Sequence, residues 1–177
     1  MTTHHTQDVQ TLPAGTWTLD PAQTTITVAA RKLGLFNVPG TVAVSRGTIE
    51  IGPDHLVNSV AVVADAGSYT SGNTKRDGHV RSADFLDAAN HPELEFRAGN
   101  VSRTPAGYRA DGSVTVKAQT FPLTVDINSV EFDARTSTFV ATANVDRTAI
   151  GVDKFPSFFI GRDLQLTVVA TAHNTEA

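Results

Sequence analysis

Apolar and polar residues alternate along most of the chain. The clearest stretch places Phe121, Leu123, Val125 and Ile127 at every second position, with Pro, Thr and Asp between them. This period of two residues is typical of a β-strand with one buried and one exposed face. Comparable stretches, separated by turn residues, lie at residues 17–19, 24–30, 41–51, 56–66, 94–96, 108–118, 139–145 and 164–172. The pattern predicts about eight or nine strands, with a β-bulge near Gly47, where the parity of the apolar positions changes.

Residues 71–92 break the alternation and carry helix signals instead. Asn73 or Thr74 offers an N-cap side chain, and Pro92 ends any helix that precedes it. The sequence therefore predicts one short helical segment near residues 73–90.

The connections between the predicted strands are short. Antiparallel pairing follows, because a parallel connection needs about a dozen residues to cross back. The predicted fold class is all-β, and alternation alone leaves both a two-layer sandwich and a closed barrel open. We expect a single domain over residues 15–173, between a flexible N-terminal tail at 1–14 and a C-terminal tail at 174–177.

Composition removes several classes of function. The 177 residues carry a formal net charge of -4, with Lys and Arg scattered singly, so we expect no nucleic-acid partner. Cysteine is absent, which excludes disulfides, thiolate metal sites and a cysteine nucleophile. The chain has no long apolar run, and its first residues lack a basic start followed by an apolar stretch. We therefore expect a cytoplasmic protein that does not span a membrane.

The densest group of polar residues lies within the predicted helical segment. An enzymatic interpretation lets Asp77 orient His79 as a general base, with Arg76 or Arg81 stabilising an anion. Histidine and carboxylate side chains here are suitable metal ligands, but their spacing matches no metal motif, so no metal is expected. In the structural alternative, these residues cap helix turns, pair with one another and hold the segment over the sheet.

Two apolar connections and many small residues bear on the interior. Residues 33–38 and 155–161 are unusually apolar for loops, so they either close over the core or line the mouth of a cavity. Alanine recurs within the strands, where a filled core favours larger side chains. An eight-stranded barrel is just wide enough to be filled by side chains or to hold one small ligand. The alanines indicate a hollow apolar interior or close packing against the helix.

The order of these motifs resembles that of the YceI-like proteins, over about residues 16–172. The most specific match is RDGHVRSADFLD at residues 76–87, which follows Ser71-Gly72-Asn73 and precedes His91-Pro92. The other matching motifs lie at residues 17–21, 112–116, 120–123, 146–151 and 160–164. Gln23-Thr24 and Lys32 stand where the family usually has histidines, which weakens an enzymatic interpretation.

The resemblance implies an antiparallel eight-stranded lipocalin-like barrel that binds an isoprenoid-type lipid for carriage, storage or sensing. The lipid classes it implies are a polyprenol, a polyprenyl phosphate or the tail of a quinone. No enzymatic activity and no required cofactor are expected, and a homodimer is compatible with the sequence. The expected cavity wall consists of Trp17, Ile26, Val28, Phe36, Phe85, Phe96, Val116, Leu123, Val125, Phe158 and Phe159. The expected cavity mouth, or structural signature, consists of Lys32, Arg76, Asp77, His79 and Arg81.

Two alternatives stay open at this point. One is a hydrolase-like enzyme centred on Asp77 and His79. The other is a barrel without a ligand, whose loops bind a protein partner.

Overall fold

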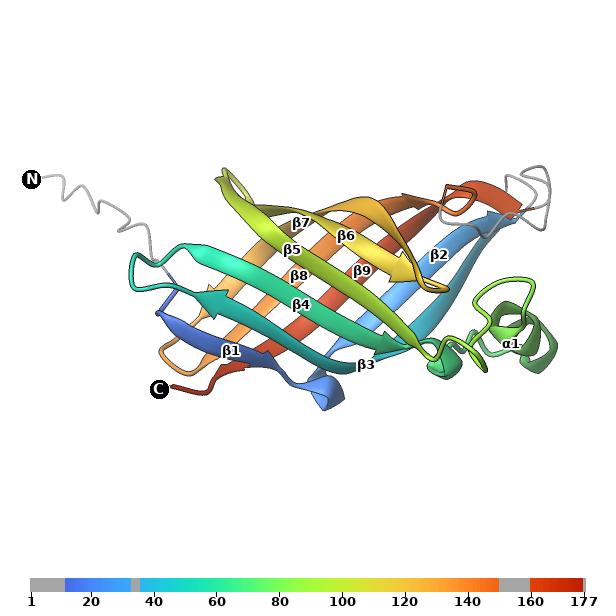
Figure 1. The fold of residues 1–177 in the computed structure, drawn as a ribbon, viewed down its shortest axis with the longest axis horizontal. Helices are drawn as coiled ribbons and strands as arrows, with labels where there is room; N and C mark the ends of the chain where they lie inside the picture. The colour runs from blue at the N-terminus through green and yellow to red at the C-terminus, as the bar shows by residue number, and fades with distance from the viewer. Residues whose placement is uncertain (1–11, 33–35, 150–159, 177) are drawn as a thin grey trace, which may run out of the picture.

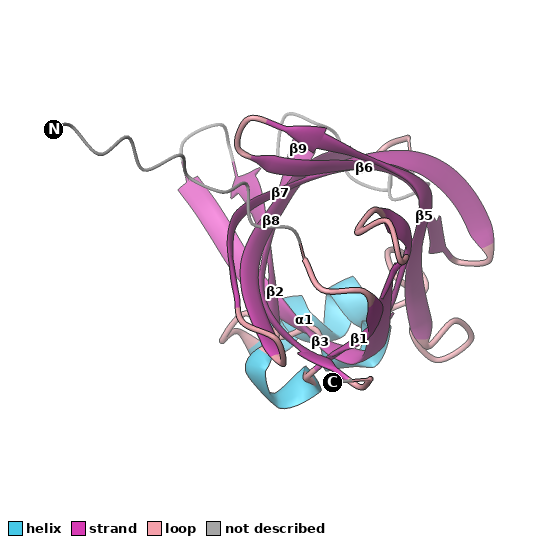
Figure 2. Ribbon diagram, turned by 90° about the vertical axis from the view of Figure 1, so that its left-hand side faces the viewer, coloured by secondary structure: helices cyan, strands magenta, loops and turns pink. Residues whose placement is uncertain are grey.

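The computed structural model describes residues 12–32, 36–149 and 160–176, in which nine strands form one antiparallel sheet. The strands are β1 (Gly15–Leu19), β2 (Thr25–Lys32), β3 (Phe36–Ile51), β4 (Val57–Asp65), β5 (Glu93–Thr104), β6 (Gly107–Val116), β7 (Gln119–Phe132), β8 (Thr136–Asp146) and β9 (Ile160–Asn174). The sheet closes on itself, because β3 pairs with β2 on one side and with β4 on the other (Figures 1 and 2).

Two strands share one position in the ring. β2 lies between β3 and β9 along one part of their length, and β1 lies between the same two strands further along. The 3-10 helix η1 (Pro21–Gln23) separates β1 from β2 and begins at Asp20, whose carboxylate accepts a hydrogen bond from the Ala22 amide at 3.0 Å. The ring therefore has eight positions, which confirms the predicted eight-stranded barrel and excludes the sandwich.

The predicted helical segment is confirmed, and its regular helix is α1 (Thr74–Arg81). Asn73 caps it by accepting a hydrogen bond from the Arg76 amide at 3.0 Å. The shorter 3-10 helix η2 (Ala66–Ser68) precedes α1, and turns follow it up to residue 90. Among the residues that are described, no helix has the length and apolar character needed to cross a membrane.

The strand irregularities follow from local sequence. The register of β3 against β4 shifts between Val44 and Arg46, so the predicted bulge is present just before Gly47. The shift lets Val44 and Ile51 both face the interior although their sequence parity differs. Lys117 and Ala118, both at positive φ, join β6 to β7 in the tight turn that suits a two-residue hairpin.

The barrel has two different ends (Figure 1). We call one the β1 end, because it carries β1 and the turns at residues 52–56, 105–106 and 133–135. The other is the α1 end, which carries α1 and the turn at residues 117–118. α1 is visible through the barrel in the view along it from the β1 end (Figure 2).

Small side chains are frequent on the inner face. Alternate residues of each strand point inward, so that Ala141 lies opposite Val168 and Ala143 opposite Leu166. The buried alanines of the strands are Ala64, Ala98, Ala110, Ala141, Ala143, Ala170 and Ala172. Because alanine occupies little volume, this face leaves more interior space than leucine or isoleucine would.

The segments next to the barrel extend beyond the predicted domain limits. Leu12 is buried, and the Ala14 carbonyl accepts a hydrogen bond from the Asn174 side chain at 3.4 Å, although the sequence placed both residues in a flexible tail. At the other terminus, the Thr175 amide donates to the Thr16 carbonyl at 2.9 Å. Residues 12–14 and 174–175 are thus part of the β1 end.

We predict opposite effects for two glycine-to-alanine substitutions. A Cβ at Gly40 would lie 2.5 Å from the Tyr69 ring, so Gly40→Ala should destabilise the fold by about 1–3 kcal/mol. A Cβ at Gly78, within α1, meets nothing within 4 Å, so Gly78→Ala should stabilise it by about 0.5–1 kcal/mol through helix propensity. Urea denaturation measures both, and equal shifts of the same sign would contradict this account of Gly40.

Candidate functional site

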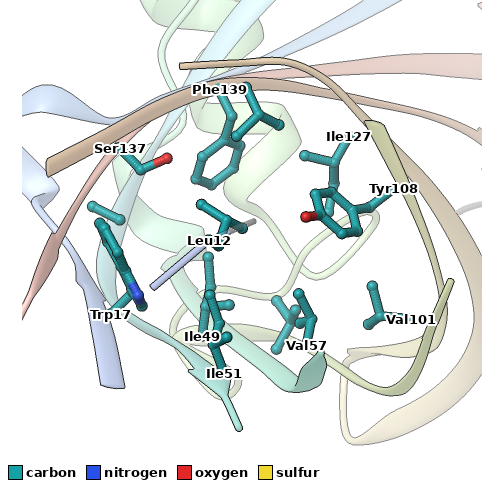
Figure 3. A pocket seen from close by; sticks show the side chains of 13 residues that line it. Leu12, Trp17, Ile49, Ile51, Val57, Val101, Tyr108, Ile127, Ser137 and Phe139 are labelled. Carbon is teal, nitrogen blue, oxygen red and sulfur yellow. The ribbon is translucent and has the colours of Figure 1, made fainter. Parts of the chain in front are cut away.

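An apolar cavity of about 50 Å³ lies inside the β1 end of the barrel (Figure 3). Its wall consists of Leu12, Trp17, Ile49, Ile51, Val57, Val60, Val101, Tyr108, Ile127, Val130, Ser137, Phe139 and Ala172. The wall is almost entirely hydrocarbon, and its side-chain polar groups are two hydroxyls and the indole N–H of Trp17. Such a surface suits an apolar group and offers little to a polar one.

Strand pairing brings these distant residues together. Trp17 lies opposite Ile49, and Ile49 lies opposite Val60, so β1, β3 and β4 supply one side of the wall. Tyr108 lies opposite Ile127, so β6 and β7 supply another. The cavity is therefore a product of barrel closure and not of any one sequence motif.

The inner face continues toward the α1 end with apolar side chains that remain partly exposed. Among them are Ile26 and Val28 on β2, Phe96 on β5, Val125 on β7 and Leu164 on β9. These side chains point into a closed ring of strands, so their partial exposure means that space beside them is not filled by other side chains. The interior therefore has room beyond the cavity at the β1 end.

The structure places the predicted wall residues in three parts of the molecule. Trp17 lines the cavity at the β1 end. Ile26 and Val28 pack against the cluster of Val42, Ala64 and Tyr69 near the α1 end. In the remaining cluster, Phe96 and Val125 pack against a buried group that contains Leu123, Ala143 and Val145.

The other predicted wall residues fall outside these groups. Val116 is buried at the end of β6, and Phe85 is buried in the turns that follow α1. The side chain of Phe36 and the whole of Phe158 and Phe159 lie outside the described residues. Their role in the wall stays a prediction.

Asp77 is the buried centre of the polar signature. Its carboxylate accepts hydrogen bonds from the Ser71 amide at 2.9 Å, the Ser71 hydroxyl at 2.5 Å and the Thr70 hydroxyl at 3.3 Å. The Ser71 hydroxyl, more than any other group, holds the pKa of Asp77 below its ordinary value, and burial opposes this effect. The carboxylate therefore fixes α1 to the segment that precedes it.

The two signature arginines reinforce the same contact. Arg76 donates from Nε to the Ser71 hydroxyl at 2.9 Å, and Arg81 donates from Nε to the Tyr69 carbonyl at 2.9 Å. Residue Thr70 in turn pairs with Thr41 of β3 through two backbone hydrogen bonds of 2.8 and 3.0 Å. The signature thus anchors α1 to the rim of the barrel. The side chain of Lys32, the fifth residue of the predicted mouth, lies outside the described residues.

His79 has different neighbours from Asp77. Its Nε2 lies 3.3 Å from a carboxylate oxygen of Asp84, and its ring meets the Phe85 ring edge-on at 5.2 Å. Residues two apart on a helix point in different directions, so Asp77 faces inward while His79 is exposed. The arrangement of a carboxylate orienting a histidine base, which the hydrolase alternative requires, is not what these contacts show.

The histidines of this segment form separate pairs with carboxylates. His91 lies 3.9 Å from Asp87, apart from the pair of His79 and Asp84. Within the described part of the chain, no three side chains of the metal-binding types converge on one point.

Several residues of the interior were missed by sequence analysis. Leu12 was assigned to a tail, and Tyr108 and Phe139 were assigned to strands but to no cavity. Arg147, within the matched motif at 146–151, is only 1% exposed and follows β8 at the α1 end, where its amide donates to the Arg162 carbonyl at 2.9 Å. A strand-like inward parity was the only available signal for Arg147, since buried arginines are rare.

Comparison with known proteins gives a consistent result. A family model described as a YceI-like domain matches residues 17–172. A UPF0312 protein of Vibrio cholerae is 25% identical over 138 residues, which cover 74% of this chain and 73% of the relative. The crystal structure of BcnA from Burkholderia cenocepacia superposes with a TM-score of 0.73 at 18% identity, over 86% of this chain and 98% of BcnA. A polyisoprenoid binding domain from Saccharophagus degradans gives 0.63 at 9% identity, over 89% of this chain and 98% of that domain.

We predict that Asp77→Asn lowers stability in a pH-dependent way. The contribution of a carboxylate with a lowered pKa is fully present above its unfolded pKa, near 3.8, and is lost as the pH falls through the lower pKa of the folded state. The urea midpoint of Asp77→Asn should therefore lie below that of the unsubstituted protein at neutral pH, and the gap should narrow in acid. Asp163→Asn, on the exposed surface of β9, controls for the loss of one negative charge. A gap that widens on acidification would contradict the anchoring role.

Proposed function

The chain belongs to the YceI-like family, and from this premise we propose that its barrel binds the hydrocarbon chain of an isoprenoid-type lipid. The apolar interior of the closed barrel is the observation that carries the proposal. The fold likeness to a domain described as polyisoprenoid binding supports the choice of lipid class.

Burial of hydrocarbon supplies the driving force. An isoprenoid chain consists of methyl-branched carbons with almost no polar atoms, so binding removes apolar surface from water. Each buried CH₂-sized group contributes about 0.8 kcal/mol, and ten such groups contribute about 8 kcal/mol before ordering costs. A ligand of this kind needs no matched polar partners along the barrel.

The wall is suited to a hydrocarbon in a second respect. A polar ligand would lose its hydrogen bonds to water on entering the barrel, and unpaired buried polar groups cost about 1–3 kcal/mol each. The wall of the cavity at the β1 end offers only the hydroxyls of Tyr108 and Ser137 and the Trp17 indole N–H, which already donates to the Pro13 carbonyl at 2.9 Å. This difference selects an apolar chain over a polar molecule of the same size.

The role we propose is non-covalent carriage, storage or sensing of the lipid. The head group is a hydroxyl, a phosphate or a quinone ring, and these three are outcomes of the binding test. The cytoplasmic location and the homodimer stay predictions from the sequence.

The test is lipid recovery combined with a matched pair of valine substitutions. Protein purified without detergent is examined by native mass spectrometry and organic extraction, and is then titrated with added polyprenol. Val125→Phe places extra bulk inside the barrel, whereas Val169→Phe changes an outward side chain that is 55% exposed. We expect Val125→Phe to weaken polyprenol binding by about tenfold, and Val169→Phe to leave it unchanged.

Circular dichroism and the urea midpoint confirm that both variants are folded. Absence of both a recovered lipid and binding of added polyprenol would overturn the proposal. Equal affinity in the two variants would show that the ligand binds outside the barrel.

A further inference from the structure

The segment Leu12–Ala14 lies across the β1 end of the barrel and is held there by three side chains. The Trp17 indole donates to the Pro13 carbonyl at 2.9 Å, and the Asn174 side chain donates to the Ala14 carbonyl at 3.4 Å. Nδ1 of His55 lies 3.1 Å from the Leu12 carbonyl, so this nitrogen carries the proton in the contact. The three side chains come from β1, β9 and the turn between β3 and β4, and successive carbonyls of the segment are therefore fixed from three directions.

This attachment directs the Leu12 side chain into the cavity. Leu12 is 8% exposed and belongs to the same buried cluster as Trp17, Leu19 and Ile51. Figure 3 shows its side chain between those of Trp17, Ile49 and Phe139, inside the ring of wall residues. The segment therefore closes this end of the barrel with a hydrocarbon group.

The closing group has the chemistry of the proposed ligand. The isobutyl group of leucine is a methyl-branched hydrocarbon of nearly the size and shape of one isoprene unit. The cavity beside it holds about 50 Å³, which is enough for a small branched group and not for a polar head with its water. The α1 end differs, because the buried charged residues Asp77 and Arg147 lie there.

We propose that Leu12 determines the length of the isoprenoid chain that the barrel accepts. The chain enters with its apolar tip toward the β1 end, and the tip stops against Leu12 and Trp17. A smaller residue at position 12 leaves room for about one more isoprene unit, and a larger one removes room. This inference rests on the proposed function, since it concerns the length limit of the same site.

The experiment offers the protein a mixture of prenols whose lengths increase by one isoprene unit, from farnesol upward. Native mass spectrometry reports which lengths are bound. Leu12→Ala should move the preferred length up by about one unit, and Leu12→Phe should move it down. Leu56→Ala is the matched control, because Leu56 is 55% exposed in the turn at the same end, and it should leave the distribution unchanged.

The outcomes separate this inference from the proposed function. If the unsubstituted protein binds no prenol, the proposed function fails. If it binds prenols and the two Leu12 variants keep the same length distribution, the proposed function stands and the length limit is overturned. A uniform loss of affinity at all lengths in Leu12→Ala would also overturn it, since it would show that Leu12 only stabilises the fold.

Trp17 tests the orientation of the chain. It is the single tryptophan of the protein and lines the cavity, so its fluorescence reports on this end alone. A quinone ring quenches tryptophan fluorescence on contact. We expect a prenylquinone to quench Trp17 no more than the prenol of equal length does. Strong additional quenching would place the head group at the β1 end and overturn the inference.

Discussion

Closure of the sheet is the constraint on which the other features depend. A strand edge exposes unpaired N–H and C=O groups, and a ring of strands removes those edges. Here the ring closes only because β1 and β2, interrupted by η1, together span the space between β3 and β9. Once closed, eight positions enclose a bore of fixed width, so the volume of the inward side chains decides whether the bore is full. The alanines of β5, β6, β8 and β9 leave it partly empty.

The two ends of this bore differ chemically, and the difference gives it a direction. At the α1 end, Asp77 and its hydroxyl donors hold α1 against the rim, and the buried Arg147 follows the last residue of β8. At the β1 end, the side chains of Leu12 and Trp17 meet inside hydrocarbon walls. An amphiphile with one polar end and one apolar end is the kind of molecule that such a gradient orients.

The sequence predicted the strands and their inward faces, because alternation at positions such as 121–127 is a local signal. It did not predict which end of the barrel each residue reaches, because that depends on register between distant strands, as with Ile49 and Val60. Leu12 was assigned to a tail because no alternation surrounds it, and its position depends on contacts with Trp17, His55 and Asn174. Asp77 and His79 are close in sequence and invite a catalytic interpretation, but helix geometry turns their side chains apart.

The titratable groups argue in the same direction as the cavity. A general base works best when its pKa lies near the ambient pH, which for a carboxylate requires an upward shift. Among the described carboxylates with a displaced pKa, Asp20, Asp77, Asp133 and Asp146 are all displaced downward, in each case chiefly by hydrogen-bond donors at a turn or helix cap. Such carboxylates are weaker bases than free aspartate, and their contacts fix connections between elements. The cavity wall contains none of them. The chemistry that this barrel can perform on a molecule inside it is therefore binding, driven by the removal of hydrocarbon from water.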